Sequence, residues 1–278
     1  MSDCNNVSYL YIANAFSPVH SGGASGNLLA DFEIQKEPRE NIPKIDSSTW
    51  KGSIATFLSE EQKKGEFSEF TFSDLKLLFF PVASSNQPFT LVTSWTRLME
   101  FFKLSKIYDV INTEYLDDIR EELGKKTRMI PIRHIMIKQK ESSVFIGGCS
   151  YVVKELNKDA EEALSKLAKI INQPVERIGI INHLDFVDIV NYELEYITRV
   201  RLGEEKVAVD QNLFVEEYLP EESILYGFIT KFRDLQKKCE EKERENFIDN
   251  MPDIVQIGKN STLGKGIVQL KRWEGKNE

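Results

Sequence analysis

Two glycine-rich loops, one near each end of the chain, place the strongest constraint on how this sequence can fold. The first runs from His20 to Asp31 and follows residues 7–16, which are apolar, β-branched and aromatic as a strand would be. The second, from Gln256 to Gly266, also lies between two strand-like segments. Glycine lets a backbone approach another group closely and adopt positive φ. We therefore expect the loops to flank one fold and to share a phosphate-binding surface.

The composition narrows the class of protein. With 41% hydrophobic and 29% charged residues, the chain is typical of a globular protein. It has no apolar run near the roughly 18 residues of a membrane span and no signal-type N-terminus, so we expect a cytoplasmic protein without a membrane partner. Cys4, Cys149 and Cys239 are widely spaced, which favours reduced thiols over a zinc site. A net charge of −8 argues against a protein that coats nucleic acid, but it allows a confined basic groove.

Helix-like and strand-like segments alternate along the chain, which indicates an α/β or α+β domain with a mostly antiparallel sheet. The expected strands are 7–16, 32–37, 70–81, 89–93, 178–181, 194–202, 212–220, 223–229, 254–258 and 266–273. The expected helices are 50–58, 94–104, 107–123, 155–171, 185–190 and 231–248. We expect strands 212–220 and 223–229 to pair with each other. The basic stretch 125–140 fits a solvated strand face as well as an RNA contact.

Six segments share their order with one known pattern. They are residues 18–23, 31–37, 48–52, 70–82, 213–220 and 256–266. Together they resemble the RAMP superfamily of CRISPR effector proteins, and within it the repeated backbone subunit of the type III-B (Cmr) complex. The chain departs from the family pattern at Ser47 and at Lys259, where glycine is usual, and at Lys36, where arginine is common. Lysine keeps the charge of arginine but cannot form its bidentate fork with phosphate.

The resemblance implies a fold and a set of partners. The fold is α+β: a modified RRM-like, ferredoxin-like palm with an antiparallel sheet, glycine-rich loops and an inserted β-hairpin thumb. Residues 1–278 would form this single domain with insertions, and the thumb would lie within residues 185–212. The partners would be a guide CRISPR RNA, a single-stranded target RNA, other copies of the chain and other subunits of the Cmr complex. The target would be cut at regular intervals, beside each base that the thumb displaces.

Asp31 is the main candidate for catalysis, because the resemblance implies that the acidic residue closing the first loop is essential for cleavage. RNA carries its own 2′-hydroxyl nucleophile, so a ribonuclease must align it, take its proton and neutralise developing charge. A lone carboxylate could act as a base or could anchor Mg²⁺ or Mn²⁺. The structural alternative is an aspartate that only caps the loop.

The other candidates surround the two loops. A free histidine side chain has a pKa near ~6.5, so its residue type makes His20 a candidate for proton transfer, but a histidine at a strand end also commonly bonds backbone or RNA. Glu216 and Tyr218 occupy alternate strand positions and so face one side, where they would assist catalysis or hold the loop. A helix N-terminus can bind phosphate, and the second loop offers donors and positive charge. The expected RNA-binding residues are Ser48, Lys51, Lys259, Asn260, Thr262 and Lys265.

The sequence is compatible with three functions. The first is a divalent-metal-dependent endoribonuclease that is also the structural backbone of a guide-RNA complex. The second is an RNA-binding assembly subunit without catalysis. The third is a metal-independent ribonuclease that processes guide RNA, with His20 transferring the proton.

Overall fold

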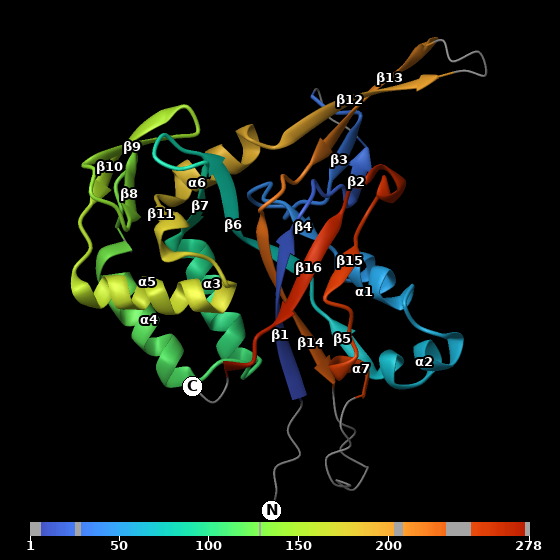
Figure 1. The fold of residues 1–278 in the computed structure, drawn as a ribbon, viewed down its shortest axis with the longest axis horizontal. Coiled ribbons are helices and arrows are strands. Elements are labelled where there is room, and N and C mark those ends of the chain that lie inside the picture. Colours follow the sequence, from blue (N-terminus) through green and yellow to red (C-terminus); the bar gives the residue numbers. More distant parts are fainter. Residues whose placement is uncertain (1–6, 26–28, 128, 203–207, 232–245, 276–278) are drawn as a thin grey trace, which may run out of the picture.

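The computed structural model describes residues 7–25, 29–127, 129–202, 208–231 and 246–275. Its strands form two sheets, and helices cover both faces of the larger one (Figure 1). Within the described residues, no helix is both long enough and apolar enough to cross a membrane. Cys149 is a free thiol, whereas Cys4 and Cys239 lie outside the described residues. The α+β class expected from the sequence is confirmed.

The larger sheet is mixed, with mostly antiparallel pairs. Its strand order is β15 (Ile254–Gln256), β16 (Ile267–Arg272), β1 (Val7–Ala15), β14 (Ile224–Lys231), β6 (Leu75–Ala83), β7 (Phe89–Ser94), β11 (Ile178–Ile181), β8 (His134–Ile137), β10 (Cys149–Lys154) and β9 (Ser143–Ile146). Two short strands, β4 (Lys44–Ile45) and β5 (Phe70–Phe72), join it beside β6 and β14. The parallel pairs are β7 with β11 and β8 with β10, so the antiparallel expectation holds for the rest of this sheet.

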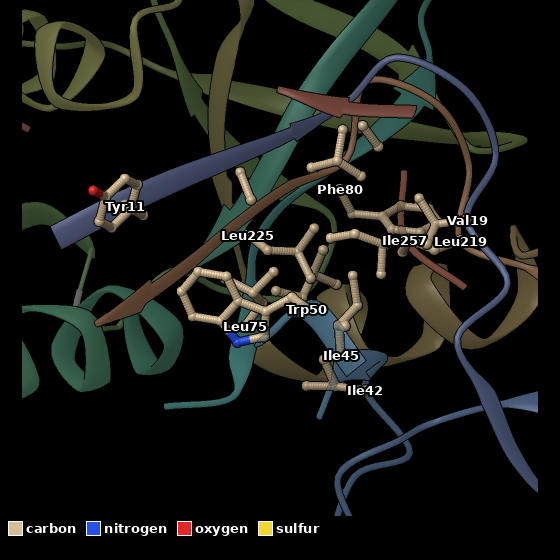
Figure 2. Packing of buried hydrophobic residues seen from close by; sticks show 14 of the residues in the cluster. Tyr11, Val19, Ile42, Ile45, Trp50, Leu75, Phe80, Leu219, Leu225 and Ile257 are labelled. Carbon is tan, nitrogen blue, oxygen red and sulfur yellow. The ribbon is translucent and has the colours of Figure 1, made fainter. Parts of the chain in front are cut away.

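Strand β1 lies inside the sheet, and both of its faces are buried. Leu10 and Ile12 belong to one hydrophobic cluster, while Tyr11 and Ala13 belong to another on the opposite face. This explains why its sequence is apolar throughout instead of alternating with polar residues. Figure 2 shows one of the two clusters, in which Trp50 packs among side chains that the sheet contributes.

The helices form two groups on opposite sides of the central strands (Figure 1). One group holds α1 (Ser47–Ala55), α2 (Glu60–Lys64) and the 3₁₀ helix η1 (Glu66–Glu69). The other holds α3 (Trp95–Ile107), α4 (Thr113–Thr127) and α5 (Lys158–Ile171), with α6 (His183–Tyr192) near β7. The remaining short helices are η2 (Val175–Arg177), α7 (Asn246–Asp249) and η3 (Ser261–Leu263). The described residues of the basic stretch 125–140 begin at the end of α4 and include strand β8.

Two secondary-structure expectations were wrong, and a third lies mostly outside the described residues. Residues 107–123 do not form one helix. Helix α3 ends at Ile107, and Asp109 then adopts a positive φ of 49°. Helix α4 starts separately, where the Asn112 side chain accepts a hydrogen bond from the Glu114 amide at 2.8 Å. Helix α1 ends at Ala55, so Phe57 is 57% exposed instead of packing inward. Most of the expected helix 231–248 lies outside the described residues, which include α7 at its end.

Strands 212–220 and 223–229 do not pair with each other, contrary to expectation. The first belongs to β13 (Ala208–Tyr218), which pairs with β12 (Glu195–Leu202), and the second belongs to β14, which pairs with β1. Local alternation shows that a segment is a strand, but partners far along the chain decide which sheet it joins. The chain therefore crosses from one sheet to the other between Tyr218 and Ile224.

The smaller sheet has the order β12, β13, β3 (Phe32–Ile34) and β2 (Gly22–Ser25). Strands β12 and β13 form an antiparallel hairpin that projects from the body of the molecule (Figure 1). The range predicted for the thumb, 185–212, begins in α6 and ends within β13, whereas the hairpin strands run from Glu195 to Tyr218. The first glycine-rich loop and the hairpin base thus share one sheet.

Candidate functional site: the junction of two glycine-rich loops and a hairpin base

Three segments far apart in the chain meet where β1 ends. Val19 and Leu219 exchange two backbone hydrogen bonds of 2.9 Å, and the Lys259 amide donates to the His20 carbonyl at 3.0 Å. Figure 2 shows Val19, Leu219 and Ile257 packed together in the core. Each of these apolar residues is adjacent in sequence to a residue of the candidate site, so core packing sets the position of the site. The two glycine-rich loops meet, as we expected from the sequence.

Glycine makes this meeting sterically possible. Gly258 has φ 88°, and a Cβ built there would lie 2.2 Å from the carbonyl oxygen of His20. At Gly23, in β2, an added Cβ would lie 2.6 Å from the carbonyl oxygen of Ile34. Real Cβ atoms do not approach so closely, so both positions require glycine. The close approach that these glycines permit is to other backbone of the same chain.

Asp31 lies at the start of β3 and is exposed. Its amide donates to the Val215 carbonyl at 2.9 Å, and its Oδ2 accepts the Val215 amide at 2.8 Å. One carboxylate oxygen therefore takes the place of a main-chain acceptor beside β13. The side chain caps the end of the loop and also presents a carboxylate to solvent, so the structural and the chemical interpretations are compatible.

The residues around Asp31 do not make a metal site from protein ligands alone. Within the described part of the chain, no three or more His, Cys, Asp or Glu side chains are grouped as metal ligands would be. Mg²⁺, however, usually keeps several waters and binds through one or two carboxylates together with substrate phosphates. An exposed carboxylate such as that of Asp31 is compatible with this mode of binding, and the divalent metal remains a prediction.

His20 is fully buried, with 0% of its surface exposed. Its Nδ1 lies 2.7 Å from the Glu217 carbonyl oxygen, which can only accept, so Nδ1 carries a proton and donates it to this bond. Nε2 is buried and has no hydrogen-bond partner among the residues that the structure describes, and the ring lies 5.3 Å from that of Tyr218. This arrangement matches a histidine that bonds backbone at a strand end, one of the two roles expected for it.

Glu216 and Tyr218 face the same side of β13 and are joined, because the Tyr218 hydroxyl donates to Glu216 Oε2 at 2.7 Å. Arg199 on β12 forms an ion pair with Glu216, with Nε 2.5 Å from Oε2. Asn260 of the second loop donates to the same oxygen at 2.9 Å. Burial, together with the bond to Glu216, raises the pKa of Tyr218, so the phenol stays protonated at neutral pH. This network holds the second loop against the hairpin base.

The helix-start candidates lie on α1. Ser48 is exposed in the first turn, and the N-cap position belongs to Asp46. The ammonium of Lys51 turns inward, where it donates to the Phe70 carbonyl at 2.7 Å and lies 5.0 Å from the centre of the Phe67 ring. Burial lowers the pKa of Lys51. The expected contacts of Ser48 and Lys51 with RNA remain predictions.

The second loop presents positive charge beside Phe32, the residue that follows Asp31, and beside Tyr218. Lys259 Nζ lies 4.9 Å from the centre of the Phe32 ring, and Lys265 Nζ lies 5.5 Å from that of Tyr218. Thr262 is exposed on η3. Two cations and a hydroxyl thus lie along the loop that contacts the base of the hairpin, which is the pattern expected of a surface that binds phosphates.

Arg199, Glu217 and the role of Lys36 were not predicted from the sequence. Glu217 is 0% exposed, and its Oε1 lies 2.8 Å from Lys36 Nζ. Strand alternation predicts that adjacent Glu216 and Glu217 face opposite sides, and two adjacent buried carboxylates need two different cationic partners. That signal was available in the Glu-Glu pair, although the identity of each partner was not.

Comparisons with known proteins agree with this geometry. The chain matches the RAMP superfamily over residues 13–269. A Pyrococcus furiosus protein, named CRISPR system Cmr endoribonuclease Cmr4, is 26% identical over 298 residues, which cover 97% of each chain.

Two solved structures share the fold. A chain in the type III-B Cmr-beta complex bound to cognate target RNA has a TM-score of 0.74 at 22% identity, covering 95% of this chain and 96% of that one. Oligomeric Cmr4 from Pyrococcus furiosus has a TM-score of 0.70 at 19% identity, covering 96% of this chain and 98% of that one. The family match over nearly the full length, together with this shared fold, leads to one conclusion: the chain belongs to the RAMP superfamily.

Proposed function

We propose that this protein is the guide-RNA-binding backbone subunit of a type III-B CRISPR effector complex, and that it cuts target RNA through Asp31. The observation that carries the proposal is the exposed carboxylate of Asp31 beside β13, in the sheet that the projecting hairpin forms. A relative that aligns over 97% of this chain is named an endoribonuclease, which supports the same reaction. Its partners would be guide RNA, target RNA, further copies of itself and other Cmr subunits.

The chain's own residues would divide the work. The ammonium groups of Lys259 and Lys265 would bind the RNA backbone, and the loop that carries them is held by Asn260. Asp31 would act on the 2′-hydroxyl or on its phosphate, because it is an exposed carboxylate next to this loop's contact at Phe32. Glu216 and Tyr218 would keep the loop and hairpin in register. A divalent cation, held by Asp31, water and RNA, would neutralise charge developing on the phosphate.

The test is a complex reconstituted with guide RNA and target RNA, in which Asp31→Asn replaces the wild-type chain. Asparagine keeps an oxygen that can accept the Val215 amide but removes the charge, so we expect assembly and RNA binding to persist while the cutting rate falls at least about 100-fold. Asp253→Asn, at an exposed aspartate elsewhere, is the matched control and should cut normally. Cutting by the Asp31→Asn complex at the wild-type rate would remove Asp31 from the mechanism.

Metal dependence is tested separately with the same complex. We expect EDTA to stop cutting and added Mg²⁺ to restore it, without loss of target binding. Cutting that persists in EDTA and disappears in His20→Ala would favour the metal-independent reaction instead. Target binding without any cutting by the wild-type complex would favour the assembly subunit without catalysis.

A further inference from the structure

Glu217 is a buried carboxylate that the proposed cleavage chemistry leaves without a role. It lies between Glu216 and Tyr218 on β13, but its side chain faces the other side of the strand and is 0% exposed. A carboxylate in such a place is costly unless ionic and hydrogen-bonding partners compensate for lost water. Its partners therefore indicate what it holds.

Those partners come from two strands that flank β13. Oε1 lies 2.8 Å from the ammonium of Lys36 and accepts the hydroxyl of Tyr196 on β12 at 3.2 Å. Oε2 accepts the backbone amide of Ile34, the last residue of β3, at 3.1 Å. The main-chain carbonyl of Glu217 also accepts the bond from His20. One residue thus links the hairpin base with His20, where the first glycine-rich loop begins, and with Ile34 and Lys36, which follow the loop in sequence.

Strand β3 pairs with β2 along one edge, but along the edge that faces β13 it has little ladder, and there the Glu217 side chain supplements it. It is three residues long, and its register with β13 consists of the single pair Phe32 and Glu216. Asp31 fixes the first end of β3 through its two bonds to Val215. At the other end, a carboxylate of Glu217 bonds the Ile34 amide in place of a main-chain carbonyl.

Glu37, which follows Lys36 in the chain, anchors this segment to the body of the protein. The Glu37 carboxylate accepts hydrogen bonds from both terminal nitrogens of Arg97 on α3, at 2.8 and 3.2 Å. Arg97 is 3% exposed and also donates to the Leu77 carbonyl on β6. The Glu37–Arg97 pair holds the backbone next to Lys36. The ion pair between Lys36 and Glu217 therefore ties β13 to a segment that is itself anchored to α3 and β6.

We propose that Glu217 is a positioning residue for cleavage: it locks the strand that carries Asp31 to the base of the β12–β13 hairpin. The reactive carboxylate and the hairpin then move as one unit when RNA binds. This inference rests on the proposed function insofar as Asp31 is the reacting group. A displacement of about 1 Å at a reacting group can lower a rate about 100-fold, which is why a residue that touches no RNA can control cutting.

The test uses the reconstituted complex with Glu217→Gln, Lys36→Met and the double variant. Glutamine keeps an acceptor for the Ile34 amide but loses the charge, and Lys36→Met keeps much of the volume while removing the ammonium. We expect each single variant to lower the single-turnover cutting rate about 10- to 100-fold at saturating target, with target affinity within about twofold of wild type. The double variant should cut no more slowly than the worse single variant, because the two residues act through one contact.

A second measurement separates positioning from general loss of structure. Amide hydrogen exchange should accelerate in residues 32–36 of Glu217→Gln and stay unchanged in β1 and β14. Glu217→Asp, which keeps the charge on a shorter side chain, should recover part of the cutting rate. Glu221→Gln, at an exposed glutamate after the same strand, is the matched control and should behave as wild type.

The outcomes distinguish this inference from the proposed function. Wild-type cutting by Glu217→Gln, losses that multiply in the double variant, or unchanged exchange in residues 32–36 would overturn the positioning role. If Asp31→Asn cuts normally, the proposed function fails at Asp31, and the exchange data then decide only whether Glu217 locks β3.

Discussion

Replacing Gly258 by alanine tests whether the contact between the two glycine-rich loops is the structural basis of the site. Gly258 has φ 88°, and an added Cβ would lie 2.2 Å from the His20 carbonyl oxygen. The adjacent Lys259 amide donates to that same oxygen at 3.0 Å. The loop must therefore move away from β1 to accommodate the methyl group, and in doing so it breaks this hydrogen bond.

The expected cost follows from two contributions. A left-handed backbone costs a non-glycine residue about 1–2 kcal/mol, and losing a buried backbone hydrogen bond costs about 1 kcal/mol more. Displacement of the packed loop adds to both, so we expect Gly258→Ala to lower the free energy of unfolding by about 2–4 kcal/mol. Gly264 provides the matched control, since its φ is 72° but an added Cβ would meet nothing within 4 Å. Gly264→Ala should cost only the backbone contribution, about 1–2 kcal/mol.

The assay is urea unfolding of both variants followed by intrinsic fluorescence, with target cutting measured in the reconstituted complex. The Gly258→Ala variant should have the lower midpoint with an unchanged slope, and it should bind RNA more weakly because Lys259 and Asn260 are displaced. Equal losses of stability in the two variants would refute the reasoning, since only the contact with His20 distinguishes the positions.

Two further predictions concern the hairpin base and the tyrosines. Arg199→Leu leaves the buried Glu216 without its cation, so it should lower the free energy of unfolding in urea by about 2–4 kcal/mol. Adding Glu216→Gln to this variant should recover part of that free energy. Losses that add in the double variant would contradict the pairing. Burial, followed by nearby carboxylates, raises the pKa of Tyr151 and Tyr196 from 10.0 to about 12. The folded protein keeps protons that the unfolded chain releases near pH 10, so this stabilisation is complete below about pH 10 and is lost as the pH rises through about 12. Phenolate absorbance should show this late titration, with one late group fewer in Tyr196→Phe; native titration of both near pH 10 would contradict it.

Much of the fold was predictable because burial leaves a local record in the sequence. The apolar run of β1, the helix start at Ser94 and the apolar face of α5 each follow from neighbouring residues alone. The Ser94 side chain accepts the Arg97 amide at 3.4 Å, which is the capping role expected for it. The glycines within the two loops likewise indicated that the backbone approaches another group closely there.

The residues of the candidate site that belong to a motif or to a regular strand spacing were predictable. Asp31 lies exposed at the end of the first loop, and the shared face of Glu216 and Tyr218 follows from strand alternation. Whether each side chain points into the protein or toward solvent was not predictable. Lys51 turns inward to Phe70 instead of outward, because the aromatic rings beside α1 make a favourable place for its ammonium.

The sequence by itself indicated the strands that flank the two glycine-rich loops, such as β1 and β16, where those loops lie and which carboxylate closes the first of them, but it did not indicate β2, β4, β9 or β10. The tertiary structure decided that β13 pairs with β12 instead of β14, that His20 is buried and that Glu217 pairs with Lys36. The physical reason is range. Periodicity and turn chemistry act between neighbours in the chain, whereas strand partners and the neutralisation of buried charge depend on residues about 180 positions away, brought together only by the packed core.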